Sequence, residues 1–426
     1  MDWSTYPRLG EHMAHAVLDN GLSIYVFPKP DYQKFFAFFA TDYGGMDMRF
    51  QENGVWRDTP AGVAHFLEHK MFDTEDGNAL QDLAANGASP NAFTSNALTG
   101  YYFECTEGFE QNLKTLLSFV SVPYFTPESV DKEQGIIGQE IRMIEDDPNW
   151  TVFMNLMSAL YRTHPVRVSV AGSVSSIAEI TADTLYACHR AFYTPENMVL
   201  CVAGNVDAAR ISELAREILP AGGTGQVERD YGPAEELTAA QPAVTTTMEV
   251  STPLFQMGCK APAPGDGPAR LRQRFVGELA WEALLGSSSP LYAKLYAAGL
   301  INSSFGYGYE DYPGCAFLTA GGESREPEAV RDAVLAEAAR LGREGLEEDR
   351  WARLKKAAYG NRVRALNSFE TLCIEQAQGH FAHFEYLSFP EVFDEVRKSD
   401  VEDCIRNWVT QAGTALSVVR PKGEHA

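Results

Sequence analysis

The stretch Gly62-Val63-Ala64-His65-Phe66-Leu67-Glu68-His69 ends in H-x-x-E-H, the zinc signature H-E-x-x-H in reverse order. Its two histidines are four residues apart, so on a helix both imidazoles lie on one face and can bind one metal ion. Glu68 lies on nearly the same face, where its carboxylate can reach a metal-held water without being a ligand. The pentapeptide alone leaves a second interpretation open, an amphipathic helix with two structural histidines.

A third ligand is expected, because a catalytic zinc usually takes three protein ligands and keeps one position for water. The helix predicted over 127–145 offers Glu133, Glu140 and Glu145. Glu133 and Glu140 are seven residues apart, which is two helical turns, so they share a face. One carboxylate can bind the metal while the other accepts the second N–H of a ligand histidine. Spacing does not separate these roles, and both glutamates can instead be solvent-facing helix residues.

Composition excludes several classes of protein. The chain has 426 residues, 45% of them hydrophobic, which indicates two or more well-packed domains. Its formal net charge of −23 repels phosphate backbones, so we expect no nucleic-acid partner, and we take the acidity to serve solubility. Seven scattered cysteines without C-x-x-C indicate buried thiols in a reducing compartment. No signal peptide or membrane-spanning run is apparent, so we expect a soluble, cytoplasmic protein that does not contact a membrane.

The first half of the chain alternates strands and helices. An Asp19-Asn20-Gly21 turn between apolar runs predicts a hairpin. The predicted strands cover 15–18, 22–27, 34–43, 91–94, 100–105 and 199–204. The predicted helices, besides the H-x-x-E-H helix, cover 79–85, 110–120, 127–145, 150–161, 181–192 and 208–218.

The second half repeats this order after residues 220–243, which lack periodicity and are rich in glycine, proline, alanine and glutamate. Its predicted elements are a strand over 247–261, helices over 269–285 and 290–297, strands over 303–309 and 315–321, helices to about 408, and a strand over 414–419. We therefore predict an α+β fold of two homologous domains, each a mainly antiparallel sheet packed by helices. Residues 1–220 form the N-terminal catalytic, metal-binding domain, 221–243 the linker, and 244–426 a C-terminal homologous domain without the metal motif.

Several further motifs carry a resemblance to a known family. They are His65-Phe66-Leu67-Glu68-His69, Asn91-Ala92-Phe93-Thr94, Glu133 with Glu140, the run 142–148 (Arg-Met-Ile-Glu-Asp-Asp-Pro), and the run 192–198 (Phe-Tyr-Thr-Pro-Glu-Asn-Met). Together they resemble the pitrilysin/insulysin family of inverted-motif zinc peptidases, which includes the mitochondrial processing peptidase β subunit. The resemblance is strong over about the first 210 residues and weak afterwards.

The resemblance implies a role for each motif residue. His65, His69 and Glu140 would be the zinc ligands, Glu68 the general base, and Glu133 the supporting carboxylate. Residues Asn91, Ala92 and Phe93 match the family's active-site edge strand, to which a substrate adds as an extra β-strand. The alternative for residues 91–94 is an ordinary sheet strand.

One departure from the family concerns the second half. Family members often carry an arginine and a tyrosine there, in a segment like Leu-Arg-Glu-x-Gly-Leu-x-Tyr, to hold the substrate. The corresponding stretch here, residues 295–302, has no arginine, and Asn302 stands at the tyrosine position. Tyr307 and Tyr309 lie downstream, where strand residues are the simpler interpretation. This gap suggests a homologous second subunit that supplies the pair, or a homodimer. The alternative is a self-sufficient enzyme that uses other donors.

We therefore expect a zinc-dependent metalloendopeptidase with Zn2+ as its cofactor, acting on extended peptides or unfolded segments with water activated by zinc and Glu68. The alternative is a non-catalytic scaffold or assembly subunit of a heterodimeric peptidase complex. Such subunits typically lose motif residues, whereas all five positions, His65, Glu68, His69, Glu133 and Glu140, are present here. A third option is a metal-dependent hydrolase of non-peptide substrates.

Overall fold

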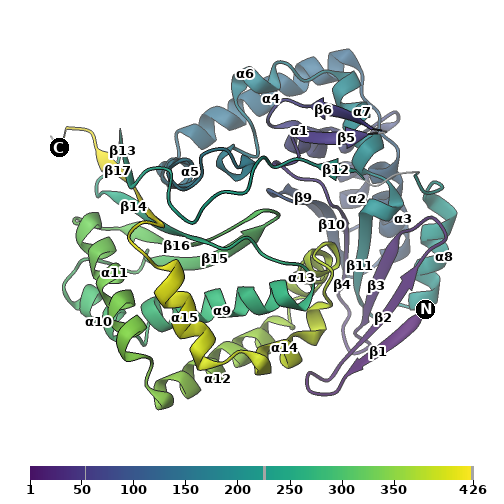
Figure 1. Cartoon of the computed structure of the whole chain (residues 1–426). Coiled ribbons are helices and arrows are strands. Elements are labelled where there is room, and N and C mark those ends of the chain that lie inside the picture. The colour runs from purple at the N-terminus through teal and green to yellow at the C-terminus, as the bar shows by residue number, and fades with distance from the viewer. Residues whose placement is uncertain (53, 224–226, 424–426) are drawn as a thin grey trace. The chain divides into compact units, whose positions relative to one another are not determined.

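The computed structural model describes residues 1–52, 54–223 and 227–423 (Figure 1). It confirms the α+β class, with helices packed on mainly antiparallel sheets. The chain divides into two compact units. The first unit contains residues 1–141, 169–230 and 362–388, and the second contains 142–168, 231–361 and 389–426.

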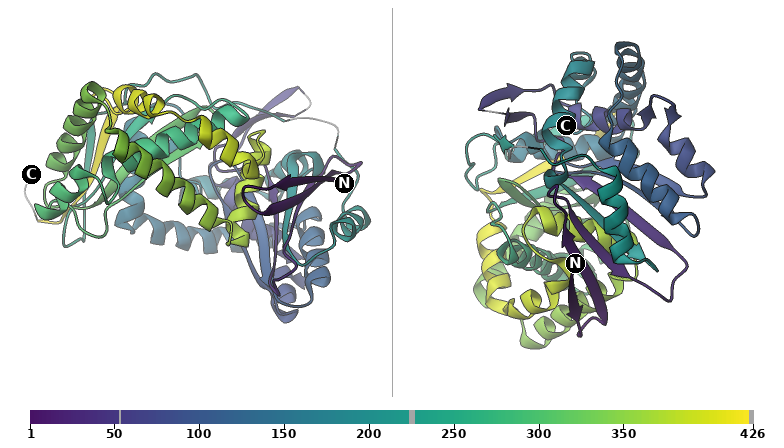
Figure 2. Two further views of the ribbon diagram at one scale, coloured as in Figure 1. Left: turned by 90° about the horizontal axis from the view of Figure 1, so that it is seen from below. Right: turned by 90° about the vertical axis from the view of Figure 1, so that its right-hand side faces the viewer.

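The first unit is built on a seven-stranded sheet with the order β1-β2-β3-β11-β4-β10-β9. All neighbouring strands are antiparallel except β3 and β11. The N-terminal strand β1 lies at one edge, dark purple in Figure 2, and β9 lies at the other. The strands are β1 (Asp2–Tyr6), β2 (Glu11–Val17), β3 (Ser23–Pro28), β4 (Phe35–Thr41), β9 (Ser89–Thr94), β10 (Thr99–Cys105) and β11 (Met198–Gly204).

The second unit contains a five-stranded sheet with the order β13-β17-β14-β16-β15, in which only β13 and β17 are parallel. Five strands of the first sheet, β3-β11-β4-β10-β9, follow the same path. In both sheets the first strand pairs in parallel with the last, and the second, fourth and third strands follow in antiparallel order. This shared topology makes β9 and β15 equivalent edge strands. The strands are β13 (Ala243–Met248), β14 (Leu254–Ala261), β15 (Gly306–Tyr312), β16 (Cys315–Glu323) and β17 (Thr414–Pro421).

Each unit includes a helix from the opposite half of the chain. Helix α5 (Pro148–Leu160) packs on β14 and β17 in the second unit, and α13 (Phe369–Phe381) packs on β11 and β4 in the first. The compact units therefore interleave along the chain. The predicted domains, residues 1–220 and 244–426, are continuous segments that mark the two copies of the duplicated fold. Their bounds remain a prediction, because the compact units are discontinuous along the chain.

Strands β4 and β11 form the centre of the first sheet because they are apolar on both faces. Every residue of β11 is buried, and β4 is buried from Phe36 to Thr41. Such continuous apolar runs are typical of strands covered on both sides. Helix α13 covers one side, and α1 and α3 contact β9, β10 and β4. This buried sheet therefore supports the edge strand β9 and helix α1, which packs on β9 and β10.

The remaining helices mostly agree with the sequence. They are α1 (Val63–Met71), α2 (Ala79–Ala85), α3 (Phe109–Ser121), α4 (Pro127–Glu145), α6 (Val174–Ile177), α7 (Ala182–Phe192), α8 (Ala208–Ile218), α9 (Pro268–Leu285), α10 (Pro290–Ala297), α11 (Pro327–Glu344), α12 (Glu348–Ala365), α14 (Phe389–Glu395) and α15 (Lys398–Trp408). Short strands β5 (Arg49–Glu52), β6 (Val55–Asp58) and β12 (Glu228–Arg229) form a small third sheet, and β7 (Asp73–Thr74) pairs with β8 (Gly77–Asn78).

The single strand predicted over 247–261 is wrong. The chain forms β13 and β14 there, separated by residues 249–253. These strands pair with opposite edges of β17, so the chain must leave the sheet and re-enter it on the other side. Pro253, which has no backbone N–H, lies just before β14. Apolar character alone did not reveal this break.

The segment 221–243 is more ordered than a simple linker. Residues 224–226 lie outside the described residues, but β12 pairs with β5. Farther on, the Glu235 carboxylate accepts hydrogen bonds from the backbone N–H groups of Arg162, Thr163 and His164 and pairs with Lys260 at 2.8 Å. The second part of this segment is therefore fastened to the second unit.

No helix of the described residues is long and apolar enough to cross a membrane.

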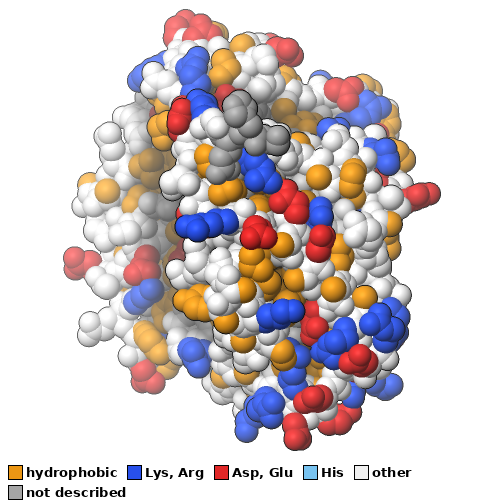
Figure 3. Space-filling model, turned by 90° about the vertical axis from the view of Figure 1, so that its left-hand side faces the viewer, with side chains coloured by type: hydrophobic (Ala, Val, Ile, Leu, Met, Phe, Trp, Pro, Cys, Tyr) orange, Lys and Arg blue, Asp and Glu red, His pale blue; other side chains and the backbone are white. Residues whose placement is uncertain are grey.

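All seven cysteines are buried and free. On the face drawn in Figure 3, basic and acidic side chains are interspersed. The negative charge therefore does not form one extended acidic patch on that face.

Candidate metal centre

Helix α1 presents the two histidines of the H-x-x-E-H motif. Gly62 precedes the helix with a φ of 98°, and an added Cβ would lie 2.6 Å from the Ala171 carbonyl oxygen, so glycine is required there. Val63, Phe66 and Leu67 are buried and anchor α1. His65 and His69, on another face, are only partly buried, with their ring centroids 4.6 Å apart.

Helix α4 brings the two glutamates to the same place. Its start is fixed by reciprocal hydrogen bonds between Thr126 and Ser129, which cap the first turn. Buried Ile137 and Ile141 hold α4 against the unit. Glu133 and Glu140 lie two turns apart and both contact the histidines of α1.

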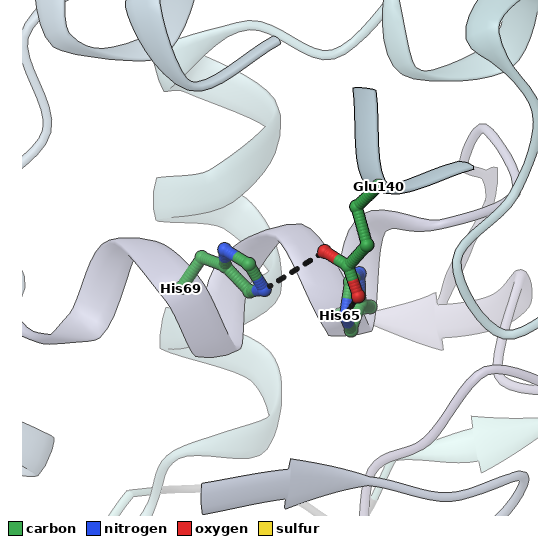
Figure 4. A group of neighbouring side chains, drawn as sticks. All are labelled: His65, His69 and Glu140. Atoms are coloured by element: carbon green, nitrogen blue, oxygen red, sulfur yellow. Dashed lines mark ion pairs between the residues drawn. The ribbon is translucent and has the colours of Figure 1, made fainter. Parts of the chain in front are cut away.

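The three predicted metal ligands, His65, His69 and Glu140, converge as one group (Figure 4). One carboxylate oxygen of Glu140 lies 3.5 Å from Nε2 of His65, and the other lies 3.5 Å from Nε2 of His69. On its far side, His69 Nδ1 lies 3.1 Å from Oε1 of Glu133. Glu133 therefore contacts a histidine from behind, while Glu140 faces both Nε2 atoms. The two glutamates, which spacing left equivalent, therefore have different positions relative to the histidines.

The donor set fits a zinc ion. The possible ligand atoms of His65, His69 and Glu140 all lie within 4.8 Å of one another, the one such group among the described residues. Two ligands at about 2.1 Å from a common zinc, at tetrahedral angles, are about 3.4 Å apart. The two 3.5 Å separations match this value. Nδ1 of His65 is buried without a hydrogen-bond partner among the described residues, whereas Nε2 of the same ring faces Glu140.

The electrostatics of the group favour a cation. Burial disfavours a charged His69, but the hydrogen bond that its ring donates to Glu133 and the carboxylates of Glu68 and Glu140 outweigh burial and raise the His69 pKa. The pKa of Glu140 is lowered, chiefly by its contact with His65 and despite its partial burial. Two imidazoles among three carboxylates therefore attract positive charge, which either a proton or a metal ion can supply.

Glu68 lies beside this group and is 8% exposed. Its Oε2 accepts a hydrogen bond of 2.7 Å from the hydroxyl of Thr94, the last residue of β9. Sequence reasoning assigned Thr94 no role in the site. The signal that could have found it is strand alternation, which directs Ala92 and Thr94 to the same face of β9.

The predicted substrate-strand residues lie on the edge strand β9. Among described residues, β9 pairs only with β10, so its other edge has no strand partner. The Ala92 N–H donates to the side chain of its neighbour Asn91 at 2.9 Å. Phe93 stacks on Phe38 with centroids 5.9 Å apart, on the sheet face opposite Thr94.

Asn302 stands at the family's tyrosine position, and Tyr307 and Tyr309 are the downstream tyrosines considered as substitutes. All three have hydrogen-bond partners within the second unit. The Asn302 amide donates to Glu323 at 2.8 Å, and the Tyr307 hydroxyl donates to Glu282. Tyr309 is buried beside Gln273. Tyr296, on α10, is 54% exposed. None of the four lies on an element that carries the metal-type group.

Comparisons with known proteins point to one family. Residues 53–174 match the model of the insulinase family, peptidase family M16, and residues 179–358 match the model of the peptidase M16 inactive domain. The chain is 35% identical to YmfH of Bacillus subtilis, described as an uncharacterized zinc protease, over 98% of both chains.

Solved structures agree with these matches. The fold resembles a crystal structure from Alicyclobacillus acidocaldarius described as an M16-like peptidase, with a TM-score of 0.93 and 30% identity, over 97% of this chain and 99% of that one. A peptidase M16 inactive domain from Pseudomonas fluorescens has the same fold, with a TM-score of 0.79 and 16% identity, over 97% of this chain and 99% of that one.

Proposed function

This chain belongs to the insulinase family of peptidases, M16, and from that premise we propose that it is a zinc-dependent metalloendopeptidase that cleaves extended peptides or unfolded segments. The observation that carries the proposal is the convergence of His65, His69 and Glu140, with Glu68 beside them. Relatives named zinc proteases support the metal.

In this proposal His65, His69 and Glu140 hold the zinc, and Glu133 accepts the second N–H of His69 and fixes its ring. When bound, zinc supplies a Lewis acid that polarises a carbonyl oxygen and makes water more acidic. Glu68 takes a proton from the attacking water and passes it to the leaving amine. Its low exposure limits competing solvent around the carboxylate.

The edge strand β9 is proposed to hold the substrate. An extended peptide that pairs with the free edge of β9 gains backbone hydrogen bonds that do not depend on its sequence. The outward N–H of Ala92 is available to such a peptide once the Asn91 side chain releases it. This favours extended or unfolded substrates over folded ones.

The missing arginine and tyrosine bear on assembly. The side chains of Asn302 and Tyr307 already donate hydrogen bonds within the second unit, which supports a role for a second subunit or a second copy of this chain.

The buried free cysteines support a reducing, cytoplasmic location as part of this proposal. The other candidate, a scaffold subunit without activity, draws on the likeness to M16 inactive domains.

The test compares purified wild type with Glu68→Gln for zinc content and for hydrolysis of an unfolded protein. We expect about one zinc per chain in both, and a loss of at least about 10³-fold in kcat for the variant. Zinc without turnover, alone or with a homologous partner chain, would support the scaffold. Hydrolysis of only non-peptide substrates would support a different hydrolase.

A further inference from the structure

Resting on the function proposed above, we propose that Thr94 is a positioning residue that holds the Glu68 carboxylate by a hydrogen bond. The hydroxyl of Thr94 donates to Oε2 of Glu68 at 2.7 Å. Among the described residues it is the one hydrogen-bond donor to this carboxylate. Glu68 is almost fully buried, so one oxygen is fixed by Thr94 and the other remains for a proton.

The hydroxyl is placed by the sheet, whereas the carboxylate belongs to a helix. Thr94 is directly opposite Thr99 in the β9–β10 ladder. The hairpin is closed just beyond it, where the Ser95 N–H donates to the Leu98 carbonyl at 2.8 Å. Ladder and turn together leave the Thr94 backbone little freedom, and a β-branched side chain has few rotamers.

The local hydrogen bonds also set the direction of the Thr94 donor. The Thr99 hydroxyl donates to the Tyr43 carbonyl at 2.9 Å and lies 3.4 Å from the Thr94 hydroxyl. The Thr94 hydroxyl therefore has the Thr99 hydroxyl on one side and the Glu68 carboxylate on the other, and it donates its single proton to Glu68. A glutamate side chain has three rotatable bonds, so this contact selects one orientation of the carboxylate before a substrate arrives.

Loss of the hydrogen bond between Thr94 and Glu68 should affect the proton transfer by Glu68 and not the binding of zinc or substrate. Thr94→Val keeps the shape and strand propensity of the residue but removes the donor. Glu68 would then lose its fixed orientation, while His65, His69 and Glu140 keep their contacts. We expect zinc content to be unchanged, kcat to fall by at least about 10-fold, and KM to stay within about twofold.

Two further variants separate positioning from a structural role. Thr94→Ser restores the hydroxyl, and we expect its kcat to return to within about threefold of wild type. Thr41→Val is the matched control, since Thr41 is a buried threonine of the same sheet whose hydroxyl donates to the Phe192 carbonyl at 2.6 Å. It should lower stability without the kcat loss.

A measurement on the metal-free full-length chain tests the contact without any activity. We compare the effect of Thr94→Val on the urea unfolding midpoint in the wild-type and Glu68→Ala backgrounds. A larger shift in the presence of Glu68 supports the proposal.

Equal shifts in the two backgrounds, a Thr94→Val enzyme with wild-type kcat, or a Thr94→Ser enzyme as impaired as Thr94→Val would each overturn it. If the wild type hydrolyses no peptide, the proposed function fails, and the two-background comparison still decides on Thr94.

Discussion

At the scale of single residues, the two glutamates of α4 have different environments. Glu140 lies between both Nε2 atoms, whereas Glu133 contacts only the far nitrogen of His69. A ligand carboxylate and a supporting carboxylate should respond differently to the same substitution, because only the first would touch the metal.

We therefore predict a graded loss of zinc affinity. Glu140→Gln should lose stoichiometric zinc, while Glu133→Gln should keep the site but bind zinc about 10–100-fold more weakly. Titration against a competing chelator measures both. Glu145→Gln, on an exposed position of the same helix, is the control and should bind like wild type. Equal affinities for Glu140→Gln and Glu133→Gln would contradict the assignment.

At the scale of elements, the edge strand β9 determines where an extended peptide can add. The Ala92 N–H bonds the Asn91 side chain and takes no part in the β9–β10 ladder. It is therefore the donor that an added strand would use.

Ala92→Pro removes this N–H without breaking a ladder bond. We predict that kcat/KM for a long peptide falls by at least about 10-fold while the unfolding midpoint changes little. Ala92→Gly, which retains the N–H, is the comparison and should remain active. Full activity of the proline variant would show that the substrate does not pair at Ala92.

The segment that carries Glu235 gives a prediction about stability and pH. Burial opposes ionisation of Glu235, but the ion pair with Lys260 and the backbone N–H groups of Arg162, Thr163 and His164 lower its pKa from 4.5 to about 2. Because this pKa is lower in the folded state, Glu235 contributes stability that is complete above pH 4.5 and is lost as the pH falls towards 2.

Glu235→Gln should therefore destabilise the protein at neutral pH, since it leaves the nearly inaccessible Lys260 without its counter-ion. Urea unfolding should show the largest difference from wild type above pH 4.5 and a narrowing difference below it. A difference that is constant between pH 6 and pH 3 would refute this account. Glu236→Gln, at the next residue, serves as the control.

At the scale of the whole molecule, five strands of the first sheet share their order with the second sheet, but among the described residues only the first unit carries the metal-type group. The second unit retains the equivalent edge strand β15, and no counterpart of His65 and His69 lies among its described residues. Because the second unit also lacks the family's arginine and tyrosine at residues 295–302, other side chains would have to hold the substrate at the single site.

If the site is complete only when two copies of this chain associate, specific activity should fall on dilution as the dimer dissociates. The measurement is initial rate against protein concentration, together with the mass in solution. Activity that appears only after a homologous chain is added would indicate a heterodimer. Constant specific activity of a monomer would exclude both forms of the partner hypothesis.

The sequence by itself determined the local features of this protein. Helices α2, α4, α8 and α10 begin and end where the caps, prolines and apolar periodicity predicted. These signals act over one or two helical turns, so they can be found without knowing what the helix packs against. The same holds for the four-residue spacing of His65 and His69.

Only the tertiary structure decided the relations between distant residues. It placed Glu140 and not Glu133 between the imidazoles, directed Thr94 to Glu68, put α13 on the first sheet, and split the predicted strand 247–261 across β17. Each of these depends on contacts between segments far apart in the chain, and the sequence pattern of either segment alone does not specify its partner.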